Sequence, residues 1–122
     1  MAESLHRGLA EGRWRTLTIA EQLGNIGSEV GRALRAKAAG NHDRMWGALA
    51  RAIELFDLTA ADPRWAGRRR KEILRAREVT CDYLAGDNTY VSTPESLDGY
   101  FTAFAVLARQ PSQVHMTTPI GS

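Results

Sequence analysis

Apolar residues recur at helical spacing along four stretches of the chain, and no stretch alternates apolar and polar residues over a useful length. Short links separate these stretches, so successive helices are expected to run in opposite directions. The pattern therefore predicts an all-α fold, an antiparallel up-down four-helix bundle. Its helices are expected at about 18–39, 41–59, 63–84 and 93–109.

Local signals mark where several of these helices begin and end. Thr18 is followed three residues later by Glu21, which is the spacing of a capping box. Gly40 suits the left-handed position that ends the first helix. Asp62 and Pro63 give an N-cap followed by proline in the first turn of the third helix.

The same pattern divides the chain of 122 residues into one helical domain and two terminal segments. The bundle is expected over 16–109, a size that can bury a core without disulfides or metal. Periodicity is weak over 1–15, which we interpret as an N-terminal arm lying on the bundle. The segment 110–122 is polar, contains two prolines, and is predicted to be disordered.

Three glycines interrupt the first helix at Gly24, Gly27 and Gly31. In an ideal helix they fall near one another on one side of the cylinder, beside an apolar stripe. Each glycine costs about 1 kcal/mol relative to alanine in a helix interior. A close approach of the backbone by another helix, either of this chain or of a partner chain, would offset that cost, so these positions are predicted to be sites of tight helix packing.

Composition indicates the class of protein and its cellular compartment, but not a reaction. Charged residues make up 25% of the chain and the net charge is +2, as in an ordinary globular protein. No apolar run is long enough to span a bilayer, and the first residues lack the apolar core of a secretory signal. Cys81 is the single cysteine, which suits a reducing compartment. We expect a cytoplasmic protein with no membrane partner and no cofactor.

The positive charge is concentrated between Arg64 and Arg77, where seven basic residues accompany one acid, Glu72. Guanidinium groups bind phosphate in a bidentate manner, and neutralising phosphates releases counterions. The run is therefore a candidate docking surface for RNA or for an acidic protein. A solvated helix face, or ion pairs with a neighbouring subunit, would explain the same charges. The candidate contacts are Arg64, Arg68, Arg69, Arg70, Lys71 and Arg75.

Other candidate sites are weaker. The spacing of Arg35 and His42 is loosely similar to the R-x4-6-H signature of HEPN-class ribonucleases, although Gly40 interrupts the helix between them. The three histidines have no ligand spacing, so no metal site is predicted. Cys81 lies in an apolar series and is interpreted as a small buried hydrophobe. Glu29 and Arg32 are expected to form an ion pair on an exposed helix edge.

Four segments together resemble a family of small, uncharacterised prokaryotic proteins, over about residues 14–109. More distantly, the length, helix order and basic surface are similar to the group that includes the accessory variability protein of diversity-generating retroelements and the proteins encoded in 23S rRNA intervening sequences. The resemblance implies a ring-like homo-oligomer with a basic surface for RNA or a reverse transcriptase. The segments are LTIAEQLGNIGSEVGRAL, ELFDLTAADPRW, REVTCDYLAGDN and STPESLDGYF.

These observations favour a non-enzymatic, homo-oligomeric interaction protein whose basic helix docks RNA or an acidic protein partner. Two alternatives remain open from the sequence. One is a HEPN-like ribonuclease that uses Arg35 and His42. The other is a purely structural module without a ligand.

Overall fold

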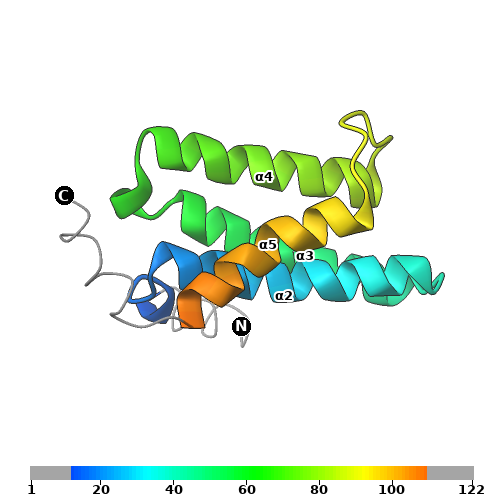
Figure 1. The fold of residues 1–122 in the computed structure, drawn as a ribbon, viewed down its shortest axis with the longest axis horizontal. Coiled ribbons are helices and arrows are strands. Elements are labelled where there is room, and N and C mark those ends of the chain that lie inside the picture. The colour runs from blue at the N-terminus through cyan, green and yellow to red at the C-terminus, as the bar shows by residue number, and fades with distance from the viewer. Residues whose placement is uncertain (1–11, 110–122) are drawn as a thin grey trace, which may run out of the picture.

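The computed structural model describes residues 12–109, and all regular structure in this part of the chain is helical. The elements follow the predicted order, and successive helices point in opposite directions (Figure 1). The prediction of an all-α fold is confirmed. The elements are α2 (Ile19–Ala38), α3 (His42–Ala60), the 3-10 turn η1 (Pro63–Trp65), α4 (Arg68–Ala85) and α5 (Pro94–Arg109).

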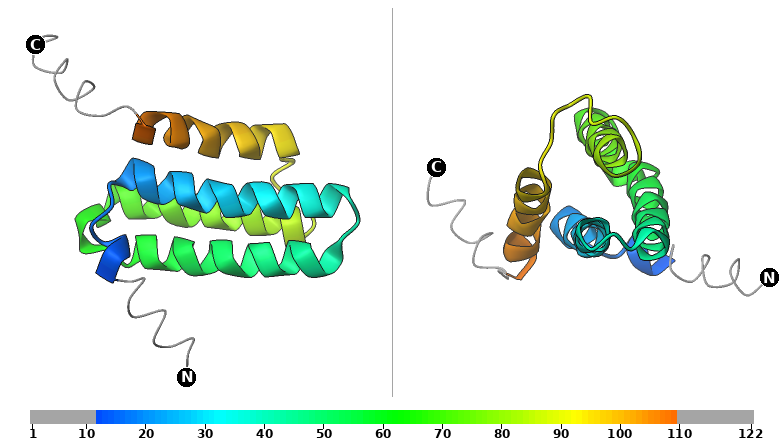
Figure 2. Two further views of the ribbon diagram at one scale, coloured as in Figure 1. Left: turned by 90° about the horizontal axis from the view of Figure 1, so that it is seen from below. Right: turned by 90° about the vertical axis from the view of Figure 1, so that its right-hand side faces the viewer.

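Helix α2 lies at the centre of the packing. It packs extensively against both α3 and α5, whereas α4 packs mainly on α3. The end-on view in Figure 2 shows α2 between α5 and α3, with α4 beyond α3. Helix α5 packs on α2, α2 on α3, and α3 on α4, whereas α4 and α5 make little direct contact. The fold is therefore open on the side between α4 and α5.

The start and end of α2 follow the local signals in the sequence. The Thr18 hydroxyl accepts from the Glu21 backbone N–H at 3.1 Å, and the Glu21 carboxylate accepts from the Thr18 N–H at 2.8 Å. This reciprocal pair is the predicted capping box. After the helix, Gly40 adopts a positive φ of 73°, a conformation that glycine tolerates best.

The third predicted helix is divided in two. Asp62 caps η1 rather than a long helix, and α4 begins only at Arg68. Between them Gly67 has a φ of 90°, which is incompatible with a continuous right-handed helix. The expectation of an unbroken helix from Pro63 was therefore wrong, because the chain turns at Gly67 before α4 sets off along α3.

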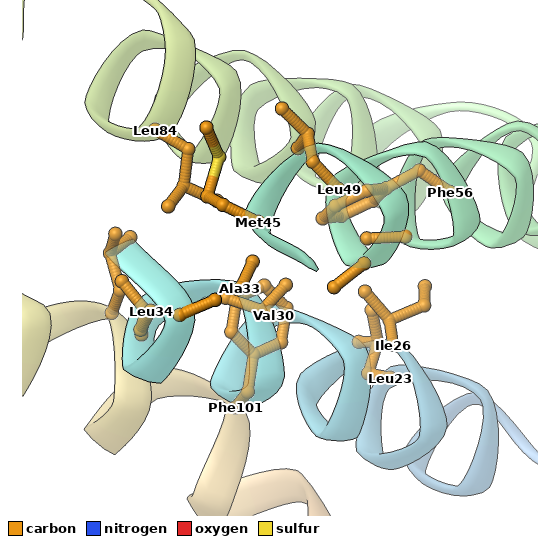
Figure 3. Close-up of a cluster of buried hydrophobic side chains, with 14 of the residues drawn as sticks. Leu23, Ile26, Val30, Ala33, Leu34, Met45, Leu49, Phe56, Leu84 and Phe101 are labelled. Atoms are coloured by element: carbon orange, nitrogen blue, oxygen red, sulfur yellow. The ribbon is translucent and has the colours of Figure 1, made fainter. Parts of the chain in front are cut away.

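The core lies where α2 faces α3, and one side chain each from α4 and α5 completes the labelled cluster (Figure 3). Apolar residues three and four apart on α2 point into it, as the periodicity predicts. Phe56 of α3 is fully buried and meets the ring of Phe101 edge-on at 6.0 Å between centroids. The labelled residues are Leu23, Ile26, Val30, Ala33, Leu34, Met45, Leu49, Phe56, Leu84 and Phe101.

The helix that approaches the glycines of α2 is α5. A Cβ atom built on Gly24 would lie 3.2 Å from Ala105 Cα, and one on Gly27 would lie 2.5 Å from Phe101 Cβ. Real side chains do not tolerate the second distance, so only glycine lets α5 lie this close at position 27. A neighbouring helix of the same chain, rather than a partner chain, makes the close approach at these two positions.

The end of the predicted N-terminal arm packs into the structure. Trp14 is buried in the core, and its indole N–H donates to the Thr59 hydroxyl at 2.9 Å. Residues 1–11 of the predicted arm and the predicted tail 110–122 lie outside the described residues. Among the residues that are described, no helix is both long and apolar enough to cross a membrane.

Candidate phosphate-binding site

A basic hollow lies between α2 and α3 and has a volume of about 540 Å³. Its floor is built from small residues, which leave room between the two helices. Longer side chains, four of them arginines and one an aspartate, stand around it. The floor includes Ala36, Ala39, Gly47 and Ala48, and the charged walls are Arg32, Arg35, Asp43, Arg44 and Arg51.

Two of these arginines are held by one carboxylate. Glu29 accepts from Arg32 at 3.0 Å and from Arg51 of the facing helix at 3.1 Å. The ion pair predicted between Glu29 and Arg32 is confirmed, and Arg51 joins it across the hairpin. Because Glu29 is mostly buried while both arginines remain more than half exposed, it anchors one guanidinium nitrogen of each arginine and leaves the rest of the side chain accessible.

The other two arginines carry the uncompensated charge. Among residues 12–109, the side chains of Arg35 and Arg44 have no hydrogen-bond or ion-pair partner, and both are exposed. Helix α2 ends where α3 begins, so the two helix dipoles offset each other here. The arginine side chains, rather than a helix terminus, therefore supply the positive charge around the hollow.

Gly31 shapes this region from the other side of α2. Unlike Gly24 and Gly27, its nearest neighbours are the guanidinium atoms of Arg35 on its own helix, with Nη1 3.3 Å from the position of a Cβ. The prediction of close helix packing at Gly31 therefore has a different outcome. The missing side chain gives room to an arginine instead of to a second helix.

Most basic side chains of the run from Arg64 to Arg77 have interaction partners within the chain. Arg64 donates to the buried Asp62 carboxylate at 2.7 Å and to the Leu17 carbonyl at 2.8 Å. Arg70 donates from Nε to the Ala60 carbonyl at 2.6 Å, at the end of α3. Arg64 thus joins η1 to the chain before α2, and Arg70 joins the start of α4 to the end of α3, so both candidate docking residues have a structural use.

Further members of the run also have partners. Arg69 lies 3.5 Å from Glu72, Arg77 lies 3.0 Å from Asp57, and the Arg75 guanidinium sits 4.9 Å from the Tyr90 ring centroid. Within the described part of the chain, Arg68 and Lys71 are the members of the run without such a partner. The structure therefore leaves these two cations open to solvent at the start of α4.

A buried polar network, which the sequence did not indicate, supports this end of the molecule. Hydrogen bonds from Arg64 lower the pKa of Asp62 to about 2, although burial acts in the opposite direction. Gln22 of α2 is fully buried, donates to Asp62 at 3.3 Å, and accepts from the Trp65 indole at 2.8 Å. The network joins α2, η1 and the link that follows α3.

The remaining candidates do not assemble into a site. Arg35 lines the hollow, whereas His42 opens α3 outside its lining, and the ribonuclease interpretation stays a prediction. Cys81 is partly rather than fully buried, and desolvation raises the pKa of its thiol. The described residues contain no group of three or more histidine, cysteine, aspartate or glutamate side chains placed to hold a metal ion.

The arginine hollow was not predicted from the sequence, because its residues lie on two helices, α2 and α3, that only the fold brings together. A docking role for the run from Arg64 to Arg77 stays a prediction. The usable signal was the pairing of i, i+3 arginines before a short turn with i, i+7 arginines after it, with small residues between. Comparison of the chain with protein-family models, with curated proteins and with solved structures finds no match in any of the three.

Proposed function

We propose that the protein is a non-enzymatic interaction protein that binds RNA through its phosphates, using the arginine hollow of the α2–α3 hairpin. The observation that carries this proposal is that four arginines from two helices line one hollow, and the side chains of two of them have no partner among the described residues. All four cations are arginines, whose planar fork suits bidentate contacts with phosphate better than lysine does.

The mode of binding follows from what else lines the hollow. Its lining holds no aromatic side chain on which a base would stack, so recognition rests on the sugar–phosphate backbone and is independent of sequence. Arg68 and Lys71, at the start of α4, would add a weaker contact. In this proposal the antiparallel four-helix bundle serves as a rigid support for its charged hairpin.

A salt titration tests the proposal. Binding of a fluorescently labelled oligouridylate is measured by anisotropy at several salt concentrations, for the wild type and for the double variant Arg35→Gln/Arg44→Gln. Two lost phosphate contacts should reduce the slope of log K against log salt by about 1.4, since single strands give roughly 0.7 per contact. The matched control, Arg68→Gln/Lys71→Gln, removes the same charge and should reduce the slope less.

The outcome separates RNA from an acidic protein partner. Tight binding of polyglutamate with none of oligouridylate would assign the hollow to carboxylates instead of phosphates. Equal slopes for the wild type and the Arg35→Gln/Arg44→Gln variant would remove the hollow from the interface, and no binding at micromolar protein in low salt would end the RNA proposal.

Self-association is the second part of the proposed function, and it is supported by α5. From Gly99 to Ala108 this helix contains no charged residue, yet α2 is the one helix on which it packs extensively. Tyr100, Val106 and Leu107 are each at least 40% exposed. A helix that is apolar all round is normally covered, so we assign its outer face to a second copy of the chain.

A further inference from the structure

The open side of the fold holds a pocket that the proposed RNA binding does not use. It lies between α4 and α5 and has a volume of about 320 Å³. That volume is at the lower end of the range for small-molecule sites and exceeds the roughly 150 Å³ of an engineered cavity that holds benzene. Its walls are mainly apolar, with Ala76, Val79, Leu97, Tyr100 and Phe101 beside Thr80, and two serines, Ser92 and Ser96, also line it.

Thr80 is the unusual member of this lining. Its side chain is fully buried, and its hydroxyl is the one buried side-chain polar atom among the described residues that has no hydrogen-bond partner. Native proteins rarely leave such groups unpaired, and each one needs a specific explanation. A helical threonine of this kind in the lining of a pocket indicates a polar group that is supplied from outside the chain.

Water is poorly suited to supply that group. A buried water needs two to four polar partners. Besides Thr80 the lining holds Ser92 and Ser96, and the Ser96 hydroxyl is already engaged, since it donates to the Thr93 carbonyl and accepts from the Thr93 N–H. An organic molecule meets the requirement differently, because burial of its apolar body holds it in place while one oxygen faces the threonine. The hydroxyl of Thr80 both donates and accepts, so an alcohol or a carbonyl oxygen would satisfy it.

The aromatic wall of the pocket restricts the shape and charge of such a molecule. The Tyr100 ring meets Phe101 and Phe104 edge-on, at 5.0 and 5.3 Å between centroids, and remains 40% exposed. At the rim, Glu72 and Arg75 carry opposite charges, so the rim favours neither an anion nor a cation. Desolvation raises the pKa of Tyr100, which fits a wall of low polarity.

We propose that this pocket binds a small, uncharged, mainly apolar molecule with one ring system and one hydroxyl or carbonyl oxygen that pairs with Thr80. The ring would pack against Tyr100 and Phe101, and the oxygen would face the floor formed by α4. The inference is independent of the arginine hollow, which lies on a different pair of helices.

Two probes that differ by one hydroxyl test the proposal. 2-Naphthol and naphthalene are titrated into the full-length protein, and backbone amide shifts are followed by NMR. We expect shifts centred on residues 76–80 and 97–101, and 2-naphthol should bind the wild type about tenfold more tightly than Thr80→Val, since that factor corresponds to one hydrogen bond. Naphthalene should bind both proteins equally well.

Three further variants make the result specific. Thr102→Val, an exposed threonine on α5 outside this pocket, should leave both affinities unchanged. Val79→Phe should fill the pocket and abolish binding of both probes. Ala76→Leu is a milder filling substitution, which should weaken the binding of both probes and replaces Val79→Phe if that variant does not fold. Absence of shifts at the solubility limit of 2-naphthol, shifts centred elsewhere, or equal 2-naphthol affinity in the wild type and Thr80→Val would overturn the proposal.

Discussion

At the scale of single residues, the most consequential group is a carboxylate that serves the fold. Asp62 is 1% exposed and accepts from Arg64 and Gln22, so its charge is held by hydrogen bonds at a point where three segments meet. Burying a charge is costly unless such partners are present. An arginine that looked available for RNA is thus committed to compensating an aspartate.

This arrangement predicts a dependence of stability on pH. The pKa of Asp62 is lowered from its ordinary value of 3.8 to about 2. The charged form therefore stabilises the folded state fully above pH 3.8, and this stabilisation is lost as the pH falls through about 2. The shift corresponds to about 2 kcal/mol, and we expect about 1–2 kcal/mol because the Arg64 side chain is 40% exposed and screened by solvent.

Asp62→Asn should accordingly lower the free energy of unfolding by about 1–2 kcal/mol at pH 7 and flatten its decline between pH 4 and pH 2. Urea denaturation followed by circular dichroism measures both effects. Asp82, whose pKa the Tyr90 backbone N–H lowers, keeps some acid dependence in both proteins. Asp57→Asn is the control, since its pair with Arg77 is exposed; an equal loss in the two variants would contradict the assignment.

At the scale of helices, the packing of α5 on α2 depends on one position more than any other. At Gly27 an added methyl group would meet the Cβ of Phe101, which is fixed to its backbone and cannot swing away. At Gly47 on α3, an added methyl group would meet a flexible arginine end, Arg51 Nη1, at 3.7 Å. Replacing glycine by alanine is therefore expected to have opposite effects on stability at the two positions.

We expect Gly27→Ala to destabilise the protein by about 1–2 kcal/mol, because overpacking exceeds the gain of about 1 kcal/mol in helix propensity. Gly47→Ala should stabilise it by about 0.5–1 kcal/mol through propensity alone. Chemical denaturation of both variants at pH 7 measures the difference. A stabilised Gly27→Ala protein would show that α5 lies further from α2 than the structure places it.

The comparison of these helices with the sequence shows which features are local. The capping box at Thr18 and the end at Gly40 depend on neighbouring residues, so the pattern predicted them. The break at Gly67 was missed because it depends on contacts across the chain, such as that of Arg70 with the end of α3. The arginine hollow was missed for the same reason, since it needs the register of α2 against α3.

At the scale of the whole molecule, the fold leaves its apolar and charged surfaces on different elements. The arginine hollow belongs to α2 and α3, the small-molecule pocket to α4 and α5, and the uncharged face to the outside of α5. Because the arginine hollow shares no residue with the exposed face of α5, the proposed RNA binding and self-association can occur together. A symmetric assembly through α5 would then present several arginine hollows at once and raise the avidity for a long polyanion.

The proposed self-association can be tested by placing a charge on the exposed face of α5. Leu107 is 44% exposed on α5, and a glutamate there would have to be buried without a partner in the assembly. Leu107→Glu should therefore raise the dissociation constant by about tenfold or more, a cost of at least about 1.4 kcal/mol. Sedimentation equilibrium measures this change against the monomer mass of 13.5 kDa.

Leu74→Glu provides the matched comparison, because Leu74 is equally exposed, at 45%, but lies on α4. It should leave the assembly intact, and circular dichroism should show the same helix content in both variants. A wild-type protein that remains monomeric at tens of micromolar would refute assembly through α5. An effect of Leu74→Glu equal to that of Leu107→Glu would instead move the interface to α4, next to the pocket, and would predict that 2-naphthol binding and assembly compete.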